Sequence, residues 1–197
     1  MAGMLNSLTP VFTMTFGYFI FRNKVTSSQS GGVILGLAGA IGLILITSGG
    51  HIGAISWHPW LIVIATICYA LSVNIIRYKL QAVDSILISG FALSIVGPPT
   101  GIYLFTTDFT ERITNNPHAL ISLGYVLLLA IFGTAISIVL FNRLIKLSGA
   151  LFASSVTYLI PIVALLWGLA DGEHMGIPHL LAMAAILGGV YMINLKK

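Results

Sequence analysis

The sequence predicts an all-α membrane protein: a polytopic helix bundle with seven transmembrane helices. Of its 197 residues, 57% are hydrophobic and only 7% are charged, whereas soluble domains carry about 25% charged residues. The apolar residues also form continuous runs without the alternation of β-barrel strands. A chain this apolar could not cover its surface with polar groups in water. We therefore expect the lipid bilayer to be its main contact.

Seven apolar runs come near the roughly 20 residues that a helix needs to cross a bilayer. They are residues 5–21, 31–47, 60–76, 86–105, 120–141, 151–169 and 177–195. These runs fill almost the whole chain and leave no room for a soluble domain. The single cysteine, Cys68, lies in the third run. It cannot form an intrachain disulfide, and we expect it to be a small buried core residue.

Charged residues in the gaps between the runs predict the orientation. Eight of the nine Lys and Arg residues fall in alternate gaps or at the C-terminus: Arg22, Lys24, Arg77, Lys79, Arg143, Lys146, Lys196 and Lys197. The positive-inside rule makes this side cytoplasmic. Among the acids, Asp84 lies on the same side, and the other four lie opposite with Arg112. The sequence thus predicts a multi-pass cell-membrane protein with a cytoplasmic C-terminus, and its net charge of +4 is not a nucleic-acid signal.

The first two helices resemble the last two. Leu-Thr-Pro10-Val-Phe begins one copy and Leu-Ile-Pro161-Ile-Val begins the other. Each proline is followed by an apolar run, a polar cap and a glycine-rich helix. Gly39 lies 16 residues after the first cap residue Asn23, and Gly189 lies 16 residues after Glu173. The charge pattern places the two caps on opposite sides, which predicts an inverted repeat, typical of secondary transporters.

Several motifs resemble the EamA family of the drug/metabolite transporter superfamily. They are Phe132-Gly-Thr-Ala-Ile, Leu140-Phe-Asn-Arg-Leu-Ile, Ser148-Gly-Ala-Leu-Phe-Ala-Ser, Tyr158-Leu-Ile-Pro-Ile-Val-Ala and Gly172-Glu173. The resemblance implies two five-helix repeats. Residues 57–195 would be the complete second repeat, and residues 1–47 the last two helices of the first. Asn23 departs from the family's usual glutamate, and His174 replaces its usual arginine.

The resemblance and the odd number of spans together predict that the chain is a fragment lacking three helices. Seven spans with a cytoplasmic C-terminus would place Met1 outside, and three further helices would return the N-terminus to the inside. On this hypothesis, residues 1–197 alone are expected to show no saturable flux in proteoliposomes.

Candidate functional residues are few, because no ionisable Asp, Glu, Lys, Arg or His lies near the middle of a span. A relay of buried carboxylates therefore has no candidate. The substrate-path candidates are Tyr69, Asn74, Thr134, Ser137, Thr157, Tyr158, Pro161 and Pro10. Asn74 and Tyr69 are the stronger ones, since a polar group facing lipid is costly. Serines and threonines in membrane helices commonly bond their own backbone instead.

Three further features have structural alternatives to a functional role. Pro10 and Pro161 free backbone carbonyls in mid-span, which suits either a moving kink or a static one. Glu173 is a helix cap or a possible coupling group. Gly32-x-x-x-Gly36 and Ala184-x-x-x-Gly188 predict close helix packing. The five histidines lack ligand spacing, so we expect no metal site and no cofactor.

These features together predict a secondary carrier of a small metabolite or drug-like solute, exporting it by alternating access. An intramembrane enzyme is the alternative, but no base lies near the serines and threonines of the spans. A non-transporting scaffold is a third class, which the repeat disfavours. The expected partners are the lipid bilayer and a small-molecule substrate, with no nucleic acid. Pairing of two copies into a homodimer is left open.

Overall fold

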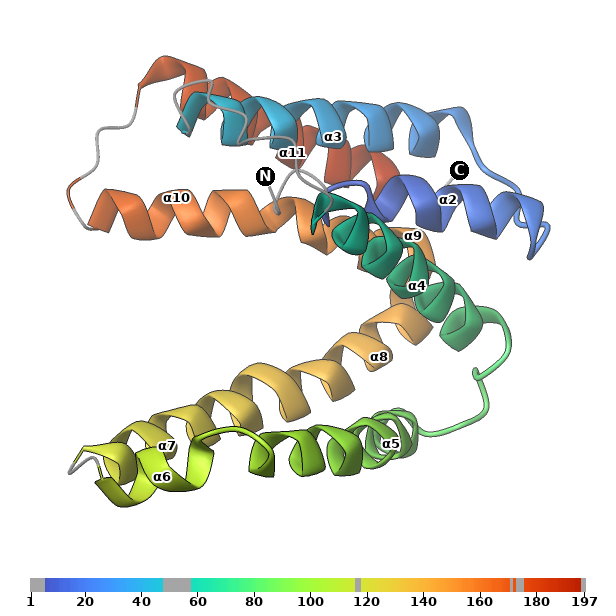
Figure 1. The fold of residues 1–197 in the computed structure, drawn as a ribbon. Coiled ribbons are helices and arrows are strands. Elements are labelled where there is room, and N and C mark those ends of the chain that lie inside the picture. Colours follow the sequence, from blue (N-terminus) through green and yellow to red (C-terminus); the bar gives the residue numbers. More distant parts are fainter. Residues whose placement is uncertain (1–5, 48–57, 116–117, 171, 173–175, 196–197) are drawn as a thin grey trace. The chain divides into compact units, whose positions relative to one another are not determined.

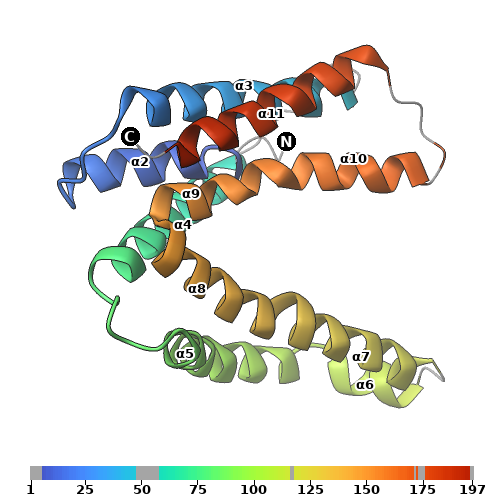
Figure 2. The same ribbon diagram turned by 180° about the vertical axis from the view of Figure 1, so that it is seen from behind.

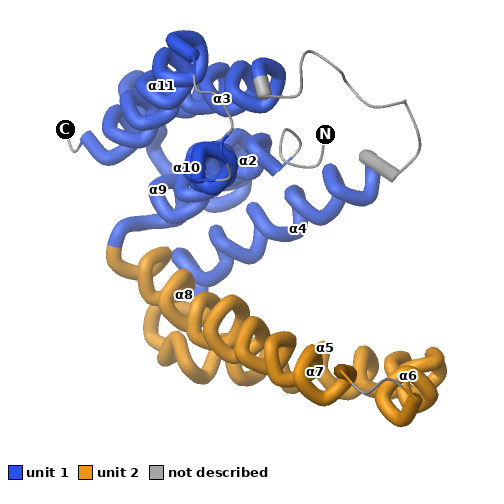
Figure 3. Tube along the Cα trace, turned by 90° about the vertical axis from the view of Figure 1, so that its left-hand side faces the viewer, with its two compact units in different colours: residues 1–79, 148–197 blue, residues 80–147 orange. Residues whose placement is uncertain are grey.

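The computed structural model describes residues 6–47, 58–115, 118–170, 172 and 176–195. All regular structure in these ranges is helical (Figures 1 and 2). The helices form two compact units (Figure 3). Unit 1 comprises residues 1–79 and 148–197, and unit 2 comprises residues 80–147.

Unit 1 brings the two ends of the sequence together. Its helical segments are α2 (Thr9–Phe19), α3 (Ser27–Thr47), α4 (His58–Tyr78), α9 (Ala150–Ser155), the 3₁₀ turn η2 (Val156–Leu159), α10 (Ile160–Ala170) and α11 (Ile177–Asn194). Helices α3 and α11 lie side by side, and α2 packs against α4 and α9 (Figures 1 and 2). The C-terminal helix therefore packs mainly on a helix that lies far away in the sequence.

Unit 2 consists of long apolar helices and one short polar helix. They are α5 (Ser85–Phe105), α6 (Phe109–Asn115), α7 (Ala119–Leu128), the π-helical segment η1 (Leu129–Ile136) and α8 (Ser137–Ser148). Asp84 caps α5, because its carboxylate accepts a hydrogen bond from the Ile86 backbone N–H at 2.7 Å. The helix α6 lies in a gap that the sequence predicts to be a loop.

Six helical segments are long and apolar enough to cross a membrane. They are Ser27–Ile46, Trp60–Tyr78, Ser85–Phe105, Ala119–Ser148, Ala150–Ala170 and Ile177–Asn194. They coincide with six of the seven predicted spans. The remaining run, residues 5–21, contains the 11-residue helix α2 in the described part of the chain. The seventh span therefore stays a prediction.

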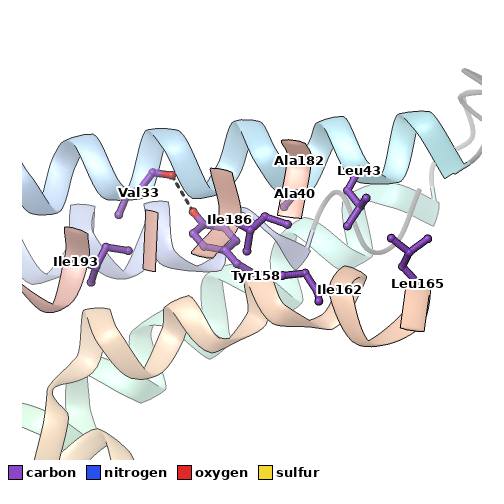
Figure 4. Close-up of a cluster of buried hydrophobic side chains, with 9 residues drawn as sticks. All are labelled: Val33, Ala40, Leu43, Tyr158, Ile162, Leu165, Ala182, Ile186 and Ile193. Atoms are coloured by element: carbon purple, nitrogen blue, oxygen red, sulfur yellow. Dashed lines mark hydrogen bonds between the residues drawn. The ribbon is translucent and has the colours of Figure 1, made fainter. Parts of the chain in front are cut away.

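The hydrophobic core of unit 1 lies between α3, α11 and the η2–α10 segment. It contains Val33, Ala40, Leu43, Tyr158, Ile162, Leu165, Ala182, Ile186 and Ile193 (Figure 4). Lipid tails are as apolar as these side chains, so the core gains stability mainly from close packing rather than from leaving water. Alanine and glycine permit that packing because their small volume lets helix backbones approach.

Two sequence predictions about local structure are wrong. Cys68 is exposed on α4 rather than buried, because the buried face of this helix is formed by residues such as Ala70, Val73 and Asn74. Residues 142–146, which the sequence places in the gap between two apolar runs, belong to helix α8. The chain turns instead at Gly149, whose φ of 96° lies in the region that favours glycine.

Candidate substrate path

Asn74 is the most deeply buried polar candidate on α4. Its side chain is 1% exposed. Its Nδ2 donates to the backbone oxygen of Thr13 on α2 at 3.1 Å and to that of Ala70 at 2.9 Å. Its Oδ1 has no hydrogen-bond partner among the described residues. The Nδ2 hydrogen bond to Thr13 connects α4 to α2. The unpaired Oδ1 remains available as an acceptor, and leaving such a buried acceptor without a partner costs about 1–3 kcal/mol.

Gly17 lies beside that available acceptor. A Cβ placed on Gly17 would be 3.2 Å from Asn74 Oδ1. Any larger side chain at residue 17 would therefore press against the amide. Glycine at residue 17 therefore lets α2 pass close to the Asn74 amide.

Tyr158 joins η2 to α3. Its ring is fully buried, and its hydroxyl donates to the Val33 backbone oxygen at 3.1 Å (Figure 4). A Cβ at Gly36 would lie 2.7 Å from the Tyr158 ring. The Tyr158 ring therefore packs directly against Gly36 of α3. Its hydroxyl forms a hydrogen bond with the backbone of the same helix. This arrangement makes Tyr158 a packing residue in the described conformation.

The two prolines lie in different local structures. Pro161 is buried and is the second residue of α10, which follows the 3₁₀ turn η2 directly. A proline cannot donate to the carbonyl four residues earlier, and the tighter turn before it accommodates that loss. Pro10 is also buried, but it lies in the first turn of α2. Pro161 thus lies inside the span Ala150–Ala170, and the kinks predicted at both prolines stay predictions.

The glycine-rich helices α3 and α11 contact each other reciprocally. A Cβ on Gly189 would lie 2.6 Å from the Gly32 oxygen and 2.5 Å from the Gly36 nitrogen. A Cβ on Gly39 would lie 2.9 Å from the Ala182 oxygen and 2.9 Å from Ile186 Cγ1. The residues that play equivalent roles in the two contacts are 150 positions apart in the sequence. The equivalent pairs are Gly39 and Gly189, Gly32 and Ala182, and Gly36 and Ile186.

A two-fold axis between two segments produces contacts of this kind, because residue i then contacts j′ and j contacts i′. The interface uses Gly189 rather than Gly188, around which a Cβ would meet only the Leu35 side chain at 3.6 Å. The close packing predicted for Ala184 and Gly188 stays a prediction.

Thr134 and Ser137 lie in unit 2, and both are exposed. Thr134 belongs to the π-helical segment η1, and Ser137 follows it directly. The Ser137 hydroxyl donates to the Phe132 backbone oxygen at 2.8 Å. Ser137 therefore bonds its own helix, which is the structural alternative for a membrane serine. Single π-helical segments within α-helices occur frequently at functional sites.

The remaining candidates are less constrained by the structure. Tyr69 is 40% exposed on α4. The Thr157 hydroxyl donates to the Ser154 oxygen at 2.8 Å. Glu173 lies outside the described residues. Unit 1 thus holds Pro10, Tyr69, Asn74, Thr157, Tyr158 and Pro161, while unit 2 holds Thr134 and Ser137.

The candidate list from the sequence omitted a buried polar pair in unit 2. Asn142 Nδ2 on α8 donates to Ser89 Oγ on α5 at 2.9 Å. Ser89 Oγ in turn donates to the Ser85 backbone oxygen at 2.9 Å. Both side chains are buried. Ser89 interrupts an apolar run, and that signal could have identified it. Asn142 was missed because the sequence places it just after the fifth apolar run, in the gap between two spans.

The described residues offer no cluster of three or more His, Cys, Asp or Glu that could hold a metal ion. The described residues instead contain polar side chains that form hydrogen bonds between apolar helices. They also contain close backbone contacts between α3 and α11. This arrangement defines a multi-pass helical membrane protein whose polar groups connect helices.

The family follows from comparison with known proteins. Residues 56–195 match the EamA-like transporter family, and the chain belongs to that family. It is similar to the uncharacterized inner membrane transporter YedA of Escherichia coli K12, with 27% identity over 205 residues. It is also similar to the uncharacterized transporter YetK of Bacillus subtilis 168, with 24% identity over 203 residues.

Both matches cover the whole chain, which spans 62% of the length of YedA and 60% of that of YetK. No solved structure matches the chain. The relatives are named as transporters, which confirms the resemblance read from the motifs and agrees with a membrane transporter rather than an enzyme.

Proposed function

We propose that the protein is part or all of a secondary carrier that exports a small metabolite or drug-like solute by alternating access. The observation that carries this proposal is the match of residues 56–195 to the EamA-like transporter family. The proposed movement is a rocking of one repeat against the other around a cavity near the membrane midplane.

The reciprocal contact of α3 with α11 supports an inverted repeat. The N-terminal part of α3 meets the C-terminal part of α11, and the C-terminal part of α3 meets the N-terminal part of α11. The two helices are therefore antiparallel, and a two-fold axis that relates them is perpendicular to both. For helices that cross a bilayer, such an axis lies in the membrane plane, as inverted-topology repeats require.

Asn74 is the residue that we propose contacts the solute. Its Oδ1 is a buried acceptor without a described partner, and Gly17 lets α2 pass close to it. A neutral or zwitterionic solute with an N–H or O–H donor would satisfy this acceptor and remove the cost of leaving it unpaired. The described part of α4 before Arg77 contains no Asp, Glu, Lys or Arg, and its one histidine is its first residue, His58.

The test compares cells that carry variants of the gene at its own chromosomal locus. Mass spectrometry would measure small solutes inside the cells and in the medium. Deletion should raise the internal and lower the external level of at least one solute. Restoring the wild-type gene or Ser72→Ala should reverse this, whereas Asn74→Ala should not. Ser72 is a suitable control because it is exposed on the same helix.

Two results would count against the proposal. One is that no solute redistributes on deletion or overexpression. The other is that the membranes gain a lipid- or peptide-hydrolysing activity that depends on the protein, which would favour the intramembrane enzyme.

A further inference from the structure

A pocket of about 400 Å³ lies within unit 1, at the end where the helices meet the predicted cytoplasmic boundary. It is formed where several segments begin or end: the α2–α3 turn, the end of α4, the start of α9 and the end of α11. Five segments long enough to cross a membrane have an end at or beside it. The pocket therefore lies at the level of the lipid headgroups if these segments span the bilayer.

The lining of the pocket favours an anion. Its lining includes Arg77, which carries a guanidinium group, and Asn23, Gln29 and Asn194, which carry side-chain amides. None of the described residues that line it is acidic, and residues 1–79 contain no Asp or Glu at all. Phe152 and Ile193 add apolar walls. Guanidinium and amide N–H groups are suited to phosphate oxygens, and the apolar walls are suited to hydrocarbon.

The walls of the pocket are fixed by contacts between the segments. The rings of Phe21 and Tyr78 stack with centroids 5.1 Å apart, which joins the end of α2 to the end of α4. The Ser28 hydroxyl donates to the Met192 oxygen at 2.8 Å, which joins α3 to α11. The pocket is thus held open by the same packing that holds the unit together.

The side-chain amide of Gln29 is oriented by a hydrogen bond that its oxygen accepts. Its Oε1 accepts from the Thr26 N–H at 3.1 Å, and its own backbone N–H meets Thr26 Oγ1 at 3.3 Å. This reciprocal pair is a capping box at the start of α3. Because the oxygen is held by Thr26, the NH₂ group is the half of the side chain that can donate to a ligand.

From this chemistry we propose that the pocket binds a phosphate group, carried by an anionic phospholipid headgroup or by a free organic phosphate. Basic pockets between membrane helices on the cytoplasmic side are suited to anionic headgroups. This site is separate from the proposed solute contact at Asn74 and does not depend on the transport function.

The test uses the full chain, purified in detergent, with two probes. Native mass spectrometry would measure retained phosphatidylglycerol, and thermal unfolding would measure stabilisation by glycerol 3-phosphate. The variants Arg77→Gln, Gln29→Glu and Lys79→Gln each lower the net charge by one. Lys79 is exposed and does not line the pocket, so it controls for overall charge.

Gln29→Glu protects the test against misfolding. Glutamate is the usual residue at this position of a capping box, so the variant should fold at least as stably as the wild type. Its carboxylate should repel a phosphate. We expect Arg77→Gln and Gln29→Glu to weaken phosphatidylglycerol retention by about fivefold or more, the scale for one basic residue near an anionic surface, with Lys79→Gln close to the wild type.

Each outcome decides the question. Retention of phosphatidylglycerol without stabilisation by glycerol 3-phosphate supports the proposal with a lipid as the source. Stabilisation by glycerol 3-phosphate, lost in Gln29→Glu, supports it with a free phosphate as the source. Equal losses in all three variants would indicate general charge attraction and overturn the site, as would a lack of binding by both probes.

Discussion

Gly189 of α11 lies so close to Gly36 of α3 that a Cβ on Gly189 would be 2.5 Å from the Gly36 backbone nitrogen. Contact with backbone atoms cannot be relieved by rotating a side chain. The pairing of the two glycine-rich helices therefore depends on the absence of a single methyl group, and the first prediction follows from it.

Gly189→Ala should separate α11 from α3 and lower the free energy of unfolding by about 1–3 kcal/mol, as overpacking of a tight interface does. The measurement is thermal or denaturant unfolding of the purified protein in detergent. Gly42→Ala is the matched control, because a Cβ on Gly42 of α3 meets nothing within 4 Å. Equal stability of the two variants would contradict the described pairing.

Ser89→Ala should destabilise unit 2. The change removes the oxygen that accepts from buried Asn142 Nδ2 at 2.9 Å and leaves that donor without its described partner. We expect a loss of about 0.6–2 kcal/mol, the range for interhelical hydrogen bonds in membrane proteins. Unfolding in detergent measures it. Ser94→Ala on the same helix is the control, since Ser94 is exposed, and it should change stability by less.

Asn74→Ala should loosen the attachment of α2 to α4. The Thr13 backbone oxygen would lose the hydrogen bond that Asn74 donates at 3.1 Å. Hydrogen exchange followed by mass spectrometry should show faster exchange in peptides from Thr9–Phe19. The exposed Ser72→Ala variant should leave that exchange unchanged. Unaltered exchange in the Asn74 variant would show that α2 is held by packing alone.

The predicted orientation can be tested with single cysteines in a Cys68→Ser background. Ala82 and Thr107 are both exposed and lie at opposite ends of α5. A membrane-impermeant maleimide added to intact cells should label Thr107→Cys. It should label Ala82→Cys only after the membrane is opened, because Ala82 is on the side with the basic residues. The reverse labelling would mean that the C-terminus is outside.

Much of the architecture follows from the sequence. The apolar runs located six helices that can cross a membrane, because a bilayer imposes a minimum length that hydropathy reveals directly. The motifs around Pro161 identified the family, since they lie close together in the chain. The two predictions that failed concern the buried face of α4, where Cys68 is exposed, and the end of α8. Cys68 is apolar enough for a protein core or for lipid, and hydropathy does not distinguish the two.

The sequence by itself determined the all-helical membrane class and the family. Tertiary structure decided which faces meet. Asn74 reaches Thr13 from 61 residues away, Tyr158 reaches Val33 from 125 residues away, and Gly189 rather than Gly188 enters the α3 contact. The reason is physical: in lipid, helix pairing is chosen by shape and hydrogen bonding between distant segments, and hydropathy along the chain records neither.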